Sequence, residues 1–80
     1  MNKKDASWEK GTKIRGKNPD VWRKDCKGNT IRYGSYGTCG EYGWEIDHKH
    51  PVSQGGTNNY RNLQALHWQA NRSKGKKYPS

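Results

Sequence analysis

The sequence is poor in the residues that build a hydrophobic core. Among its 80 residues there is no Phe, and only 28% are hydrophobic. A chain this short has marginal stability, so we expect help from a metal ion, a disulfide or a partner. Four Trp and five Tyr must supply most of the core, because each aromatic ring buries a large area.

Long apolar runs are also absent. The residues behind Met1 lack the apolar run of a signal peptide, and no stretch is apolar enough to span a membrane. We therefore expect a cytoplasmic protein without a membrane partner. Cys26 and Cys39 lie thirteen positions apart, which is not the CxxC spacing of a zinc ribbon. In a reducing compartment we expect both thiols to be free.

Positive charge is what the sequence has in excess. Lys and Arg number 16 against 7 Asp and Glu, which gives a formal net charge of +9. Such a charge on a small domain predicts a polyanionic partner. We expect nucleic acid rather than a membrane, because no stretch is a basic amphipathic helix with a continuous apolar face. The alternative is that the charge serves solubility alone.

The first half of the chain predicts an arm and a hairpin. Residues 1–18 are basic and show no period of 2 or 3.6, which predicts an irregular or mobile arm, although Trp8 favours some docking. The arm either follows a phosphate backbone or is a solvated tail. Residues 21–25 and 30–33 flank a Gly-Asn turn and predict a short β-hairpin. Its cations form either a basic platform for DNA or an ordinary charged face.

The second half predicts a strand, a loop, a second strand and a helix. Residues 44–49 alternate between apolar and polar side chains, as in a half-buried strand. After a long polar loop, a short strand is expected near 62–64 and a helix over 66–74, which ends at a glycine. Residues 76–80 are expected to be a mobile tail.

Four polar residues in this half have the order and spacing of a known motif. Asp47 and His48 lie near the end of the first strand, Asn62 follows His48 by fourteen positions, and Asn71 follows Asn62 by nine. This pattern resembles the HNH nuclease motif, a two-stranded hairpin followed by a helix around one metal ion. The third motif position is often His in that family, and here it is Asn71.

The resemblance implies a fold class and a domain organisation. It is strong over 44–75, the motif core, and weaker over 21–43. We expect an α+β fold with one small domain over 19–75. In that domain a ββα-metal hairpin-helix core is preceded by a short β-hairpin and by the basic arm of 1–18.

The resemblance also implies roles for the motif residues. His48 matches the general base; an ordinary His has a pKa of about 6.5 and is largely neutral at physiological pH. Asp47 and Asn71 match the metal ligands, and a carboxylate with an amide oxygen is a hard donor set that suits one Mg²⁺ or Mn²⁺ ion. Asn62 matches a structural residue that ties the hairpin loop. Three of these residues have an ordinary alternative when taken singly: His48 as a core residue of the Trp44 face, Asp47 as a solvent-facing strand residue, and Asn71 as an amide on the helix surface.

Three further residues are candidates for phosphate or DNA binding. Arg72 and Lys74 follow Asn71, where the family places cations that bind phosphate; the alternative is a solvated helix end. His67 lies four positions before Asn71 and would share its helix face. It either contacts a substrate phosphate or simply begins the helix, and the second interpretation is preferred.

The sequence thus supports three functions. The first is a metal-dependent HNH endonuclease that hydrolyses phosphodiester bonds of double-stranded DNA. We expect a monomer, whose single site favours nicking one strand. The second is a non-catalytic basic module that binds nucleic acid. The third and least favoured is a structural zinc module built on Cys26, Cys39 and histidines.

Overall fold

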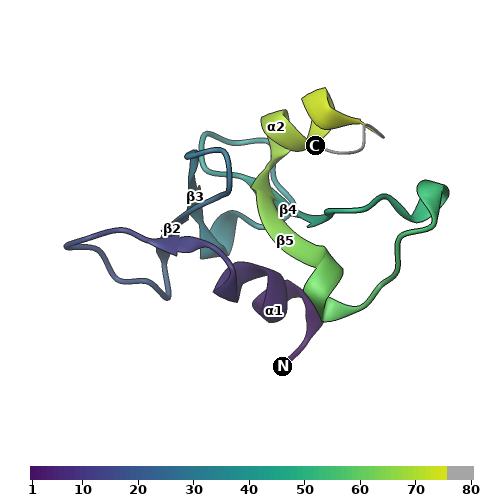
Figure 1. Cartoon of the computed structure of the whole chain (residues 1–80). Helices are drawn as coiled ribbons and strands as arrows, with labels where there is room; N and C mark the ends of the chain where they lie inside the picture. The colour runs from purple at the N-terminus through teal and green to yellow at the C-terminus, as the bar shows by residue number, and fades with distance from the viewer. Residues whose placement is uncertain (76–80) are drawn as a thin grey trace.

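The computed structural model describes residues 1–75, in which two α-helices and five short strands follow one another (Figure 1). Their bounds, in chain order, are α1 (Lys3–Glu9), β1 (Thr12–Lys13), β2 (Trp22–Lys24), β3 (Thr30–Arg32), β4 (Trp44–His48), β5 (Leu63–His67) and α2 (Trp68–Lys74). The first three strands form one antiparallel sheet in the order β1-β2-β3, and β4 pairs with β5 in a second. The expected α+β class is confirmed.

Two expectations concern the C-terminal tail and a possible membrane span. The mobile tail expected at 76–80 lies outside the described residues. Neither helix of residues 1–75 has the length or the apolar character needed to cross a bilayer.

The pair β4–β5 and the helix α2 form the expected hairpin-helix core. The two strands are antiparallel, with Trp44 opposite His67, and β5 runs directly into α2. Two boundaries differ from the prediction: β5 is five residues long rather than a short strand near 62–64, and α2 begins at Trp68. Leu66 is buried in the strand pair, and this pairing outweighs the helix propensity of the segment.

The helix α1 corrects the expectation of an irregular or mobile arm for residues 3–9, which are part of the arm predicted over 1–18. Asn2 caps α1 by accepting a hydrogen bond from the Asp5 amide at 2.8 Å. Trp8 is buried against Trp44, with ring centroids 5.2 Å apart. A helix of seven residues is too short to show a clear period of 3.6, and its sequence therefore carries little sign of it.

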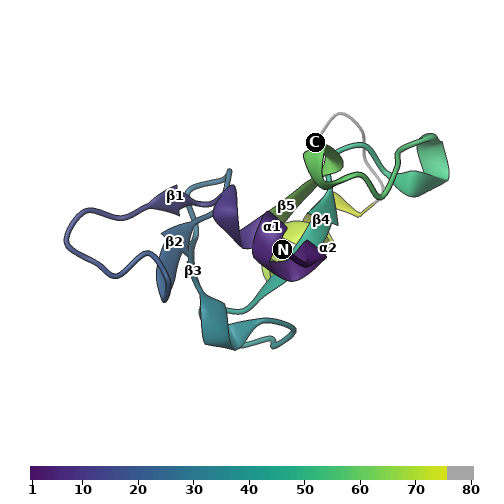
Figure 2. The same ribbon diagram turned by 90° about the horizontal axis from the view of Figure 1, so that it is seen from below.

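Helices α1 and α2 lie on opposite sides of the β4–β5 pair. Seen from below in Figure 2, α1 is in front of the two strands and α2 is behind them. Lys10 at the end of α1 donates through Nζ to the carbonyls of Tyr60 and Leu63, the second at 2.6 Å. The buried cluster next to α1 joins both sheets and consists of Trp8, Ile31, Trp44 and Ala65, with Tyr33 at its edge.

The predicted hairpin of β2 and β3 is present, but Arg23 does not contribute to a basic platform. The side chain of Arg23 is nearly buried: its Nε donates to the carbonyl of Pro19 at 2.8 Å and its guanidinium to that of Glu9 at 3.1 Å. Arg23 therefore holds α1 against β2 and is not available to a phosphate. The other cations of the hairpin are exposed, namely Lys24, Lys27 and Arg32.

Candidate functional site

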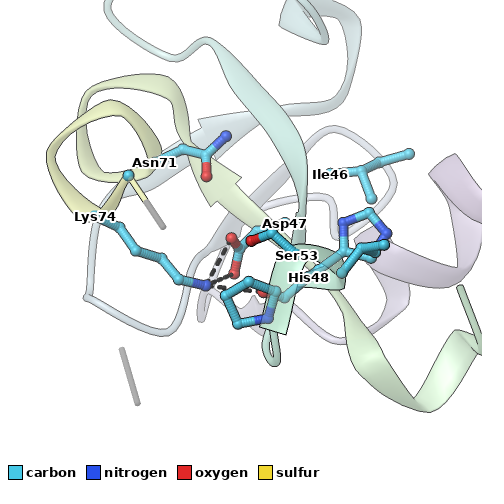
Figure 3. Close-up of a pocket in the computed structure, with 9 residues that line it drawn as sticks. Ile46, Asp47, His48, Ser53, Asn71 and Lys74 are labelled. Carbon is cyan, nitrogen blue, oxygen red and sulfur yellow. Dashed lines mark hydrogen bonds and ion pairs between the residues drawn. The ribbon is translucent and has the colours of Figure 1, made fainter. Parts of the chain in front are cut away.

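A cavity of about 370 Å³ lies where the end of β4 meets α2 (Figure 3). It brings together Asp47 and His48 from the strand and Asn71 and Lys74 from the helix. Neighbouring side chains on a strand point to opposite faces. Both Asp47 and His48 nevertheless line this cavity, because His48 is the last residue of β4 and the cavity extends past the strand end. The other lining residues are Ile46, Pro51, Val52, Ser53 and Gly75.

Asp47 is buried, and both oxygens of its carboxylate accept hydrogen bonds. The ammonium Nζ of Lys74 lies 2.8 Å from both Oδ1 and Oδ2, and Gln64 donates to Oδ2 at 2.8 Å. The same ammonium donates to the carbonyl of His48 at 2.9 Å. The two paired side chains are each only 5% exposed. Lys74 is therefore a buried partner of Asp47, and not the solvated helix end that the sequence allows.

Asn71 is oriented by Glu45. Its Nδ2 donates to Glu45 Oε1 at 2.9 Å, and in Figure 3 its amide oxygen is on the side that faces Asp47. The other carboxylate oxygen of Glu45 accepts a hydrogen bond from Arg72 at 3.3 Å, which raises the pKa of Arg72 above its ordinary value. Arg72 remains 60% exposed. Glu45 was not predicted, although the strand alternation places it on the same face as Asp47.

His48 is held by Asn58, a contact that the sequence pattern does not predict. The distance from His48 Nε2 to Asn58 Oδ1 is 2.8 Å. An amide oxygen only accepts, so Nε2 carries the proton of this hydrogen bond, and Nδ1 of a neutral ring is then the basic nitrogen. Asn58 lies in the polar loop before Asn62, and its spacing carries no signal of its own.

Asn62 ties the loop between β4 and β5 together. Its Oδ1 accepts from the amide of His50 at 2.8 Å, and its Nδ2 donates to the carbonyls of His50 and Thr57 at 2.9 and 2.7 Å. The loop is so tight here that a Cβ atom at Gly56 would overlap the His50 carbonyl. These contacts support the structural role expected of Asn62, because they fix the loop that follows His48.

His67 begins α2 and does not line the cavity. Its Nδ1 accepts from the amide of Gln69 at 3.1 Å, and its Nε2 donates to the carbonyl of Glu41 at 2.8 Å. Its own amide donates to Asp25 Oδ2 at 2.9 Å. Because His67 precedes the helix, it does not share a helix face with Asn71. The geometry gives no support to a phosphate contact by His67, since both ring nitrogens already serve the fold.

Nothing in residues 1–75 supports a structural zinc site. Cys26 and Cys39 are both exposed and free. No three His, Cys, Asp or Glu side chains in that range gather into a set of metal ligands. The oxygens of Asp47 and Asn71 do not form such a group, because Asn71 contributes an amide oxygen. Their chemistry fits a hard divalent ion such as Mg²⁺ or Mn²⁺, with water or substrate completing the shell.

Comparison with known proteins identifies a family for this chain. The family model described as HNH endonuclease matches residues 25–77. No curated protein and no solved structure gives a significant match. The matched segment covers more than half of the 80 residues and contains every residue that lines the cavity. The chain therefore belongs to the HNH endonuclease family.

Proposed function

We propose that this protein is a metal-dependent endonuclease that hydrolyses phosphodiester bonds in double-stranded DNA. His48 is the general base, and Asp47 and Asn71 hold one Mg²⁺ or Mn²⁺ ion. The observation that carries the proposal is the common cavity of these three side chains, which come from a strand end and a separate helix. Membership of a family of nucleases and the net charge of +9 support a nucleic acid as the substrate.

His48 is arranged to accept a proton from a water molecule. Because Nε2 donates to Asn58, Nδ1 is the nitrogen that can act as a base, and the hydrogen bond fixes the plane of the ring. A bound divalent ion would supply Lewis-acid stabilisation of the charge that develops on the phosphate. Arg72 and the cavity residue Asn71 both donate to the carboxylate of Glu45. The Arg72 side chain is largely exposed, so its guanidinium can bind a phosphate oxygen.

A plasmid assay tests the proposal. Supercoiled DNA is incubated with the protein and Mg²⁺, Mn²⁺, Zn²⁺ or EDTA, and the nicked circular form is quantified on a gel. We expect nicking with Mg²⁺ or Mn²⁺, none with EDTA, and none with His48→Ala. His50→Ala is the matched control, because His50 lies two residues further on and outside the cavity. Equal activity of wild type and His48→Ala would contradict the proposal.

One observation favours a second candidate, a non-catalytic module that binds nucleic acid. Both oxygens of Asp47 are already paired with the ammonium of Lys74, so a metal ion would have to compete for them. DNA binding in a gel-shift assay, combined with no cleavage under any metal condition, is the result that would favour this candidate.

A further inference from the structure

We propose that Lys74 is a built-in competitor of the divalent ion. Its ammonium holds the Asp47 carboxylate in the metal-free protein, and it leaves that carboxylate when the ion binds. This inference rests on the proposed function, because it takes Asp47 as a metal ligand. It adds that the affinity of the site for metal is set by a cation of the chain itself.

The pair is unlike an ordinary surface ion pair. The side chains of Lys74 and Asp47 are each 5% exposed, so neither water nor salt screens their attraction well. The ammonium is further fixed by the carbonyl of His48 at 2.9 Å. An ion that takes Asp47 must replace a buried, well-oriented cation and not merely displace water.

The hydrogen-bond geometry leaves little room for both cations. A carboxylate has about four lone-pair positions. Lys74 uses one on each oxygen of Asp47, and Gln64 uses a second on Oδ2. With the donors that residues 1–75 supply, one position on Oδ1 is left for a metal ion, and an ion there would lie beside a positive ammonium. Repulsion between the two charges in a poorly screened site favours exchange over coexistence.

The cavity offers space for the displaced ammonium of Lys74. Lys74 is the last residue of α2 and is followed by Gly75, whose φ is 55°; both residues line the cavity. The lysine stem has four flexible carbons, so the ammonium can swing from Asp47 into that cavity. Exchange would then add a positive charge to the surface that faces a substrate phosphate. In this way the phosphate contact expected of Lys74 becomes available only in the metal-loaded protein.

Calorimetric titration of the full chain with Mn²⁺ alone tests the exchange. Lys74→Met removes the charge and keeps most of the apolar stem. Losing a hydrogen-bonded ammonium from the carboxylate should tighten Mn²⁺ binding by about tenfold or more, on the scale of hydrogen bonds to charged groups. Lys49→Met is the matched control. It removes one charge from an exposed side chain close to His48, and we expect it to change the affinity by less than about twofold.

A second measurement covers the case in which Lys74→Met is poorly folded without metal, because it leaves Asp47 buried and unpaired. Thermal melts followed by circular dichroism should show a larger Mn²⁺-induced rise in Tm for this variant than for wild type. Affinity and Tm responses no greater than those of wild type would overturn the inference while leaving the nuclease proposal standing. The variant Asp47→Asn tests whether Mn²⁺ binding depends on Asp47. If wild type and Lys74→Met show no binding that this change removes, both the inference and the nuclease proposal are overturned.

Discussion

Replacing Asn58 gives a sharp test of how the general base is held. Asn58 is exposed and contacts His48 through a single hydrogen bond, from Nε2 to Oδ1 at 2.8 Å. Asn58→Ala removes that acceptor and leaves the ring of His48 free to rotate and to carry its proton on either nitrogen. We expect slower cleavage from a smaller fraction of correctly placed base, with little change in DNA affinity.

The size of the effect follows from that one contact. A neutral hydrogen bond contributes about 0.5–1.5 kcal/mol, which corresponds to a loss of roughly 2–13-fold in kcat. Removing the base itself should cost about 10²–10⁴-fold. The two ranges do not overlap, so the rate distinguishes a residue that positions His48 from a residue that performs the chemistry.

Asn58→Asp supplies the decisive comparison, because a carboxylate accepts a hydrogen bond but does not donate one. Single-turnover nicking of plasmid DNA at saturating protein measures the rate apart from any loss of affinity caused by the added negative charge. We expect Asn58→Asp to stay within about threefold of wild type and Asn58→Ala to fall below it. If the Asp variant is the slower of the two, then Asn58 does not act as an acceptor and the assignment of the basic nitrogen is wrong.

Three further predictions concern catalysis, stability and the cysteines. His48→Ala should lose about 10²–10⁴-fold in cleavage rate, while its DNA affinity in a gel-shift assay changes little. That affinity should fall steeply with salt, with a slope of roughly −0.9 in log K against log salt for each phosphate contact. A flat salt response would remove the argument for a polyanionic partner. Trp8→Ala should lower the free energy of unfolding by about 3–5 kcal/mol in urea titrations, because its ring is packed against Trp44; a change below about 1 kcal/mol would mean that α1 contributes little to the core. The double change Cys26→Ser and Cys39→Ser should leave both the circular dichroism spectrum and activity unchanged, since both thiols are exposed and free; a loss of bound zinc together with the fold would refute this.

The hairpin-helix core was predictable because its signals are local. Strict alternation over β4 and the fixed spacings to Asn62 and Asn71 depend only on the geometry of a strand, a loop and a helix. The spacing of such a motif therefore indicates which residues of the strand, the loop and the helix lie near one another. The chemical roles of His48, Asp47 and Asn71 remain predictions, because geometry places these side chains together without showing a reaction.

The partners of those residues were not predictable. Lys74 lies 27 positions after Asp47, and a lysine at a helix end is ordinarily exposed. Only the packing of α2 on β4 turns its ammonium inward. Arg23 is a similar case: it is one cation of a basic hairpin in the sequence, and it becomes buried because α1 offers it backbone carbonyls. Such contacts join segments that are far apart in the sequence, and they leave no periodic pattern from which they could be predicted.

The docking of α1 on β5 also determines when the chain can fold during its synthesis. Lys10 binds the carbonyl of Leu63, 53 positions later, and the hydroxyl of Tyr60 donates to the carbonyl of Met1 across 59 positions. A nascent chain that lacks β5 leaves Trp8 without Ala65, its neighbour in the core. Because non-local contacts must wait for loop closure, folding should be slow for so small a domain. The ring of Trp8 should therefore stay exposed to aggregation or to chaperones until β5 has left the ribosome.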